Sequence, residues 1–553
     1  MLKQHNQMIR RLLLSTLLFL VLISLLSYDY NDKEGPVSKT PNILLVVADD
    51  LGYADLGCYG GDIATPNIDR IAEQGIRFSR FHTSPFCAPS RAMLLSGNDN
   101  HIAGMGSQDL VTDQFGYEGR LSDRIATIPQ ILRNAGYQTF ITGKWHLGFS
   151  PEAYPGQKGF DHSFVNLFGE GNHYNDQGWE EVKPVTRYLE NGKPAKWENG
   201  KYSTNLYTDK LIQHIDQYRN SEQPFFAMAS YTSPHWPLQV DEKYWKKYQG
   251  RYDEGYEKLK QKRFENLKRM GIIPQNAELP PSHPKIKAWD SLTLEEKKSE
   301  SKKMELYAGM VDNLDYNVGR LLDYLKDIGE YENTIIVFMS DNGAAGEDFY
   351  HNELYGPYVQ KYFSNAYDRM GKADSFVSYG PQWAEAGTAP FKYYKSFTTE
   401  GGMNSPMIMS GPGIEVQDKF NHEFITIMDL APTFYDIAKT SYPLRFLGRE
   451  IYPLKGTSLL PLALGNSYPV HGPSYVFGFE HRNYAMLRKG DWKITNLNKP
   501  LDKKNFKLYK LSNDLAEQHD LKEIESNKYH ELLNEWDKFA REIKVQVPTP
   551  SSK

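Results

Sequence analysis

Two pairs of neighbouring side chains supply hard oxygen ligands. Asp49 and Asp50 form one pair, and Asp341 and Asn342 form the other. Carboxylate and amide oxygens suit Ca²⁺ or Mg²⁺ better than zinc, and the sequence contains no CxxC pair and no HExxH motif. Either pair alone is also an ordinary turn sequence. The prediction of a shared metal site therefore depends on the two pairs meeting in space.

One cysteine lies in a segment where it could act as a nucleophile. Cys87 and Arg91 belong to the stretch SPFCAPSRAMLLSG, in which a loop with two prolines precedes an apolar stretch of helical character. A thiol beside an arginine at the start of a helix is typical of a low-pKa nucleophile or a phosphatase-like oxyanion loop. The alternative is a buried, inert thiol, which would be an oxidation liability in an exported chain.

Apolar runs of strand length precede these polar segments. We predict buried strands at 41–48, 138–142, 224–230 and 334–340, and helices at 65–75, 128–135 and 304–328. Strands that alternate with helices indicate an α/β fold with a parallel sheet, and ligands bind such sheets at the carboxyl ends of the strands. The polar residues just past the predicted strands are Asp49, Asp50, Lys144, His146, His235, Asp341 and Asn342.

Three further regions differ in composition from this α/β pattern. Residues 241–303 are rich in Lys and Glu, and we expect a surface insertion there, with substrate contacts. Residues 343–390 form an irregular stretch of the kind that shapes binding sites. Residues 467–553 contain short strand-like runs and a final helix at 522–543, which predicts a small antiparallel α+β domain.

The composition excludes several classes of protein. The chain has 553 residues, of which 40% are hydrophobic, so it can form a large core and is not a disordered chain. Its net charge of −5 is small and argues against a nucleic-acid partner held by a basic face. Two cysteines exclude a disulfide scaffold, and we expect Cys58 to be a packing residue.

The amino terminus has the pattern of an export signal. Residues 1–11 contain three basic residues and no acid, and residues 12–26 form an apolar run. This order is typical of a secretory signal, whereas a helix that spans a bilayer needs about 20 apolar residues. We expect residues 1–30 to be a signal peptide or an uncleaved signal-anchor that tethers the protein to a membrane through 12–26. The protein would then be exported, to the periplasm or the extracellular space.

Several motifs together resemble those of a known family. Cys-x-Pro-Ser-Arg followed by x-x-Leu-Leu-Ser-Gly, at 87–97, resembles the first signature of the type I sulfatases, and GYQTFITGKWHLG, at 136–148, resembles the second. Further matches, in family order, are TPNID at 65–69, SPHWPL at 233–238, SDNG at 340–343, KSFTTEGG at 395–402 and LYKL at 508–511. The segments 98–106 and 382–402 are most similar to those of bacterial arylsulfatases.

The resemblance implies a fold and a chemistry. The fold would be alkaline phosphatase-like, with a large mixed, mostly parallel sheet sandwiched by helices in a catalytic domain at 40–460. The reaction would be hydrolysis of a sulfate ester. One hydroxyl of a hydrated formylglycine would attack sulfur, and the other would allow sulfate to be expelled. A formylglycine-generating maturation enzyme would convert Cys87 to this residue, also called 3-oxoalanine.

The resemblance also implies a role for each site residue. One calcium ion (Ca²⁺) would be held by Asp49, Asp50, Cys87 as formylglycine, Asp341 and Asn342. Arg91 would steady the formylglycine, and Lys144 and Lys395 would bind sulfate oxygens. His146 would hydrogen-bond the hydrate, and His235 would lie on the leaving-group side. Four further residues are expected to line the substrate pocket, namely His101, His173, Trp236 and Trp383.

The sequence leaves the substrate and two alternative functions open. Aryl sulfates and sulfated carbohydrates are equally consistent with the motifs. Phosphonate monoester and phosphodiester hydrolases of the same superfamily share the Cys-x-Pro-Ser-Arg loop and are one alternative. A non-catalytic protein that binds sulfated glycans is another, which the intact set of nucleophile, metal ligands and lysines argues against.

Overall fold

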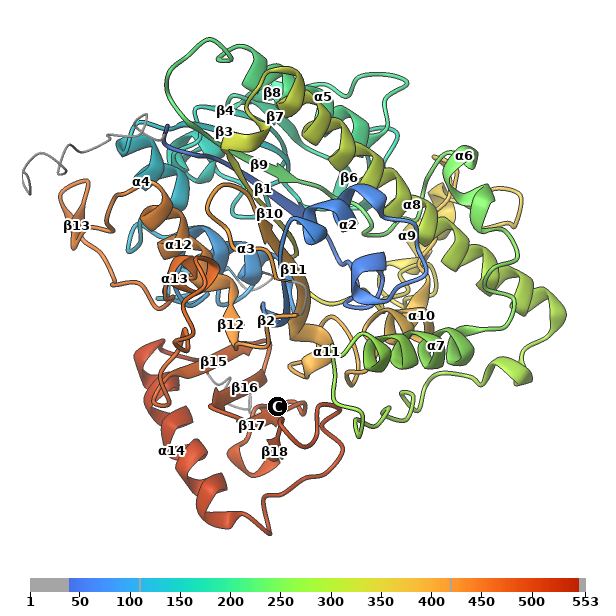
Figure 1. Ribbon diagram of the computed structural model, residues 1–553. Coiled ribbons are helices and arrows are strands. Elements are labelled where there is room, and N and C mark those ends of the chain that lie inside the picture. The colour runs from blue at the N-terminus through green and yellow to red at the C-terminus, as the bar shows by residue number, and fades with distance from the viewer. Residues whose placement is uncertain (1–38, 109–110, 418–419, 547–553) are drawn as a thin grey trace, which may run out of the picture. The chain divides into compact units, whose positions relative to one another are not determined.

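The computed structural model describes residues 39–108, 111–417 and 420–546 (Figure 1). The predicted signal segment at 1–30, with its apolar run at 12–26, lies outside the described residues. From Pro41 onward the chain forms one compact unit. Within the described ranges, every helix is too short or too polar to cross a membrane.

A ten-stranded mixed sheet forms the centre of the fold (Figure 1). Its strands, in their order across the sheet, are β12 (Ile425–Thr426), β2 (Gly75–His82), β11 (Asn404–Ser410), β10 (Thr334–Ser340), β1 (Asn42–Ala48), β9 (Phe225–Ser230), β3 (Gln138–Lys144), β4 (His162–Asn166), β7 (Tyr188–Glu190) and β8 (Lys193–Ala195). The five strands from β10 to β4 are parallel, and antiparallel pairs flank them. This confirms the predicted large, mostly parallel sheet.

Strand β1 shows how the sheet comes to be covered on both faces. All seven of its residues are buried, and alternate side chains point to opposite faces of the sheet. Leu44, Val46 and Ala48 belong to one core cluster, whereas Ile43, Leu45 and Val47 belong to the other. The first cluster includes residues of α2 (Pro66–Glu73), α5 (Ser203–Asp216) and α8 (Leu294–Asp327). The second includes residues of α3 (Cys87–Ser96), α4 (Ile128–Asn134) and α12 (Leu430–Ile437).

Residues 241–303 have a buried face in addition to the expected exposed one. They contain α6 (Glu242–Trp245), α7 (Tyr256–Arg269) and the first turns of α8. Helix α8 begins well before the predicted residue 304, because Thr293 and Glu296 form a capping box at Leu294. Four buried tyrosines join the first core cluster at four-residue intervals, namely Tyr244, Tyr248, Tyr252 and Tyr256.

The remaining elements before the C-terminal sheet are short. The helices are α9 (Gly356–Tyr362), α10 (Gly380–Gly387), α11 (Glu400–Met403) and α13 (Leu460–Ala463). The two-stranded ribbons pair β5 (Gln177–Glu180) with β6 (Lys183–Val185), and β13 (Arg445–Phe446) with β14 (Arg449–Glu450). The segment that follows β10 is irregular until α9 begins.

A smaller antiparallel sheet near the C-terminus confirms the predicted α+β fold there (Figure 1). Its strands are β15 (Val476–His481), β16 (Tyr484–Lys489), β17 (Trp492–Asn496) and β18 (Lys507–Lys510), and α14 (Ser526–Glu542) packs against them. Buried charges join this sheet to the larger one. Lys493 lies 2.8 Å from a Glu400 oxygen in α11 and 3.0 Å from Glu517, while His82 of β2 contacts the other Glu400 oxygen at 2.7 Å.

Candidate active site

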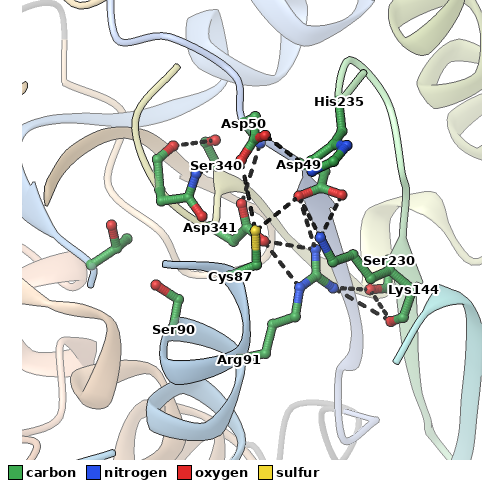
Figure 2. Close-up of polar contacts among 12 residues, drawn as sticks. Asp49, Asp50, Cys87, Ser90, Arg91, Lys144, Ser230, His235, Ser340 and Asp341 are labelled. Atoms are coloured by element: carbon green, nitrogen blue, oxygen red, sulfur yellow. Dashed lines mark hydrogen bonds and ion pairs between the residues drawn. The ribbon is translucent and has the colours of Figure 1, made fainter. Parts of the chain in front are cut away.

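The carboxyl ends of four neighbouring strands, β10, β1, β9 and β3, bring the predicted site residues together (Figure 2). The register pairs Ala48 with Ser340, so the acidic pairs that follow β1 and β10 lie side by side. Asp50 accepts a 2.6 Å hydrogen bond from Asn342 Nδ2, and its own backbone N–H donates to Asp341 Oδ1 at 3.3 Å. The two ligand pairs therefore do meet in space.

Cys87 is the first residue of α3, and its side chain points at Asp49 and Asp50, which directly follow β1 (Figure 2). Its Sγ lies 3.5 Å from Asp49 Oδ1 and 3.7 Å from Asp50 Oδ1. The residue is only 4% exposed, and this burial raises the pKa of the thiol well above its ordinary value. A low-pKa thiolate, one of the interpretations of the sequence, is therefore disfavoured.

Two lysines neutralise the aspartates beside Cys87. Lys144, the last residue of β3, donates to both carboxylate oxygens of Asp49 at 2.8 Å. Lys395 donates to Asp50 Oδ2 at 2.7 Å. Asp50 adopts a left-handed backbone conformation, with φ of 64°, which an aspartate tolerates better than most residues. This turn directs the Asp50 carboxylate toward Cys87 and Lys395.

Arg91 holds the other side of the cluster. Because it follows Cys87 by four residues in α3, both side chains lie on the same face of that helix. Its Nε and Nη2 lie 3.0 and 2.8 Å from Asp341 Oδ2, and its Nη1 donates to Ser230 Oγ. Ser230 in turn donates to the backbone carbonyl of Lys144 at 2.7 Å. We did not predict a role for Ser230, although its place at the end of the predicted strand 224–230 pointed to it.

The two histidines lie at the same edge. His235 Nε2 is 3.4 Å from Asp50 Oδ2, and its Nδ1 donates to the Trp236 carbonyl at 2.7 Å. His146 has a φ of 56°, and its Nδ1 is buried without a hydrogen-bond partner among the described residues. Burial lowers the pKa of both rings well below the ordinary value, and in the case of His146 the positive charge of Lys144 adds to this effect. Both rings are therefore neutral at physiological pH.

The donor set fits a hard divalent cation. Ligand atoms of Asp49, Asp50, Cys87 and His235 lie within 4.8 Å of one another, while Asp341 is oriented by Arg91 and the Asp50 N–H. Asn342 uses its Nδ2 on Asp50, which leaves its Oδ1 buried and without a partner among the described residues. An oxygen of this kind beside carboxylates is a metal-ligand arrangement.

The charge of the cluster supports the same interpretation. The three carboxylates of Asp49, Asp50 and Asp341 face three cations, Lys144, Lys395 and Arg91. Burial, and next the charge of Asp49, raises the pKa of Asp341 to about 6, as expected for a buried acid beside other carboxylates. A divalent cation would relieve this crowding and leave the site net positive, which suits an anionic substrate.

The four further expected residues have different positions. His173 Nε2 donates to the His235 carbonyl at 3.2 Å and its Nδ1 accepts from the Ser203 hydroxyl at 2.6 Å, so His173 supports the backbone of His235. Trp236 packs beside His235 with the rings tilted by 44° and their centroids 4.2 Å apart. His101 is fully buried and hydrogen-bonded to a glutamate of β15. Trp383 is fully buried in the first core cluster, so the expectation that it lines a pocket was wrong.

Comparison with known proteins gives consistent matches over most of the chain. The family model for sulfatases matches residues 41–440. An uncharacterized sulfatase of Schizosaccharomyces pombe is 41% identical over 520 residues, which cover 90% of this chain and 93% of that protein. The arylsulfatase of Klebsiella aerogenes is 39% identical over 430 residues, covering 76% of this chain and 91% of that protein.

A solved structure agrees in fold over the same extent. The crystal structure of Ps i-CgsB in complex with k-i-k-neocarrahexaose aligns with a TM-score of 0.64 at 27% identity, covering 91% of this chain and 93% of that one. The match thus includes the smaller C-terminal sheet as well as the larger one. Since the family model extends from β1 to α12 and the relatives align over most of their length, the chain belongs to the sulfatase family and is a sulfuric ester hydrolase.

Proposed function

We propose that this protein hydrolyses aryl sulfates or sulfated carbohydrates to a phenol or alcohol and inorganic sulfate, with formylglycine at position 87 and one Ca²⁺. The observation that carries the proposal is the Cys87 side chain, which lies between Asp49 and Asp50 where two lysines converge. A sulfate ester is an anion whose sulfur is shielded by oxygens. Its hydrolysis therefore needs cations around those oxygens and a nucleophile held in line.

The buried thiol supports conversion of Cys87. Because its pKa is raised by burial, Cys87 is protonated at neutral pH and is a weak nucleophile. A formylglycine hydrate supplies two hydroxyls on one carbon, one for attack on sulfur and one for release of sulfate. His146, a neutral ring with a buried Nδ1 that has no partner among the described residues, is proposed as the base for the second step.

The remaining residues are proposed to bind and orient the sulfate group. Asp49, Asp50, Asp341 and Asn342 would hold the Ca²⁺, which supplies positive charge next to the sulfate oxygens. Lys144 and Lys395 would bind two of those oxygens, and Arg91 would keep Asp341 in place. Burial is the largest single effect and lowers the pKa of Lys395, but Asp50 and the other acidic groups around it together outweigh burial and raise that pKa well above its ordinary value. At neutral pH, Lys395 is therefore protonated, whereas His235 is not.

Mass spectrometry of the peptide around Cys87 tests the modification directly. Conversion of cysteine to formylglycine lowers the mass by about 18 Da. Cys87→Ala should lower turnover of p-nitrophenyl sulfate at least about 10³-fold while leaving the fold intact. Cys58→Ala is the matched control, since Cys58 packs in the first core cluster, and it should retain activity. An active protein with an unmodified Cys87 thiol would refute the mechanism.

A second assay separates this proposal from the phosphonate alternative. Turnover of p-nitrophenyl sulfate is compared with turnover of a phosphonate monoester and a phosphodiester that carry the same leaving group. We expect the sulfate to be the preferred substrate. Preference for either phosphorus ester would favour the alternative. We also propose that the protein is exported, from the pattern of residues 1–30, which microscopy or fractionation of cells that express the full chain would test.

A further inference from the structure

Two glutamates flank the proposed sulfate site without a role in the chemistry above. Glu170 follows β4, next to Gly169, and a Cβ placed on Gly169 would lie 2.6 Å from His146 Nδ1 and 2.9 Å from Lys144 Cε. The backbone of this segment therefore lies directly against one side of the site. Glu347 belongs to the segment after β10, and its Oε1 accepts a 3.0 Å hydrogen bond from Ser396, the neighbour of Lys395.

Among the described residues, neither carboxyl group has a charged partner, and both glutamates are only partly exposed. Glu347 Oε2 is buried with no hydrogen-bond partner in the described part of the chain. Burial raises the pKa of Glu170 to about 7 and also raises the pKa of Glu347. Lys395 opposes the increase in both cases, so both carboxyls lie within electrostatic reach of the same lysine. An unpaired polar atom held in this way indicates a partner that is not part of the chain.

The sulfate group is not that partner. A carboxylate repels a sulfate monoester, and Lys144 and Lys395, which are proposed to bind the sulfate, pair with Asp49 and Asp50 rather than with either glutamate. The acids must therefore face the part of the substrate that leaves. The position of Glu347 agrees with this, because its near neighbour Phe349 contacts Trp236 in a tilted arrangement with ring centroids 4.4 Å apart, and Trp236 contacts His235 in the same way at 4.2 Å.

Trp236 adds a donor to these acceptors. It is 7% exposed, and its indole N–H is buried with no partner among the described residues. Two carboxyl groups and one N–H, with aromatic rings next to Glu347, match a leaving group that carries several hydroxyls and has an apolar face. A phenyl ring without substituents could fill the apolar part but would leave the carboxyls unsatisfied.

We infer that Glu170 and Glu347 are specificity-determining residues that accept hydrogen bonds from hydroxyls of the leaving group, so that the preferred substrate is the sulfate ester of a sugar or similar polyol. This inference rests on the proposed function, since it concerns the leaving group of the same reaction. It assigns no step of bond breaking to either glutamate. Their contribution is made to binding and orientation of the alcohol.

The experiment compares two classes of substrate in the same variants. Glu170→Ala and Glu347→Ala are assayed with p-nitrophenyl sulfate and with the 6-sulfates of galactose, glucose and N-acetylglucosamine. For a sulfated sugar, loss of a hydrogen bond to a carboxylate should lower kcat/KM about 10- to 100-fold. For p-nitrophenyl sulfate the change should stay within about 3-fold. The conservative Glu347→Gln, which keeps an acceptor oxygen, should recover part of the loss.

The control is Glu353→Ala, which removes an exposed glutamate from the same segment and should leave both substrates unaffected. Equal losses on both substrate classes would overturn the inference, because they would indicate a general effect on the site. Turnover of p-nitrophenyl sulfate by the unaltered enzyme with no turnover of any sulfated sugar would also overturn it, while the proposed function would stand. No turnover of any sulfate ester would refute the proposed function itself.

Discussion

Replacement of Lys144 by methionine should reveal how the charges of the site are balanced. The Lys144 ammonium lies 2.8 Å from both oxygens of Asp49, and both side chains are 0% exposed. Methionine has a similar shape without the charge, so Lys144→Met leaves Asp49 buried and unpaired. Removing one partner of a buried ion pair typically costs about 3–5 kcal/mol of unfolding free energy, and we expect the full value here because water reaches neither group.

The size of this loss should depend on calcium. In EGTA, Asp49 would have only the more distant Arg91, 4.0 Å away, to offset its charge. In saturating Ca²⁺ the proposed ion would replace much of the lost positive charge, so the difference in unfolding free energy should shrink. Turnover should not recover, since loss of a group that stabilises the transition-state charge costs about 10²- to 10³-fold in kcat.

Urea denaturation in EGTA and in Ca²⁺, together with p-nitrophenyl sulfate kinetics, gives both readouts. The matched control is Lys201→Met, because Lys201 pairs with Asp209 at 2.7 Å but is 43% exposed. Exposed pairs contribute about 0–1 kcal/mol, so this variant should be close to the unaltered protein. A Lys144→Met protein that is destabilised by less than about 1 kcal/mol in EGTA would refute the reasoning, as would full turnover.

Three further outcomes follow from particular contacts. Gly169→Ala should lower kcat/KM at least about 10-fold, because its Cβ would collide with His146 and its φ is 91°, whereas Gly192→Ala, with open space around it, should not affect kinetics. Lys493→Met should lower the unfolding free energy by about 3–5 kcal/mol with or without calcium. An unfolding free energy in urea equal to that of the unaltered protein would contradict this. Burial lowers the pKa of His214 from 6.5 to about 4, so only the unfolded chain takes up a proton there as the pH falls below 6.5. Through His214, the unaltered protein should therefore lose about 1.4 kcal/mol of unfolding free energy between pH 7.5 and 5.5. His214→Phe should abolish this part of the loss, as measured by urea denaturation at both pH values.

Much of the fold was predictable because its strands are buried on both faces. A strand such as β1 carries an apolar side chain at nearly every position, so its limits are visible in the sequence. The polar residue that ends each run then marks the edge of the sheet where the site forms. This is why Asp49 and Asp341 could be expected to meet, although nearly 300 residues separate them.

Other features depend on tertiary contacts that leave a weaker signal. The buried face of residues 241–303 went unrecognised because Lys and Glu dominate that composition, and only the four-residue spacing of its tyrosines pointed to it. The left-handed backbone of Asp50 and His146 is set by the surrounding structure, since neither residue type requires it. Glu170 and Glu347 carried no motif, so only their positions beside the site and the unpaired Oε2 of Glu347 drew attention to them.

The separation of the site residues along the chain also determines how much time passes between the synthesis of one and the synthesis of another. Asp50 and Lys395, which contact each other in the site, are 345 residues apart in sequence. At about 5–20 residues per second, the ribosome needs roughly 20 to 70 s to cover that interval. During that time Cys87 has already been made but has no Lys395 beside it and no closed site around it. Once folding is complete, the side chain is only 4% exposed, so the proposed maturation enzyme would have its best access to Cys87 while the chain is still being made.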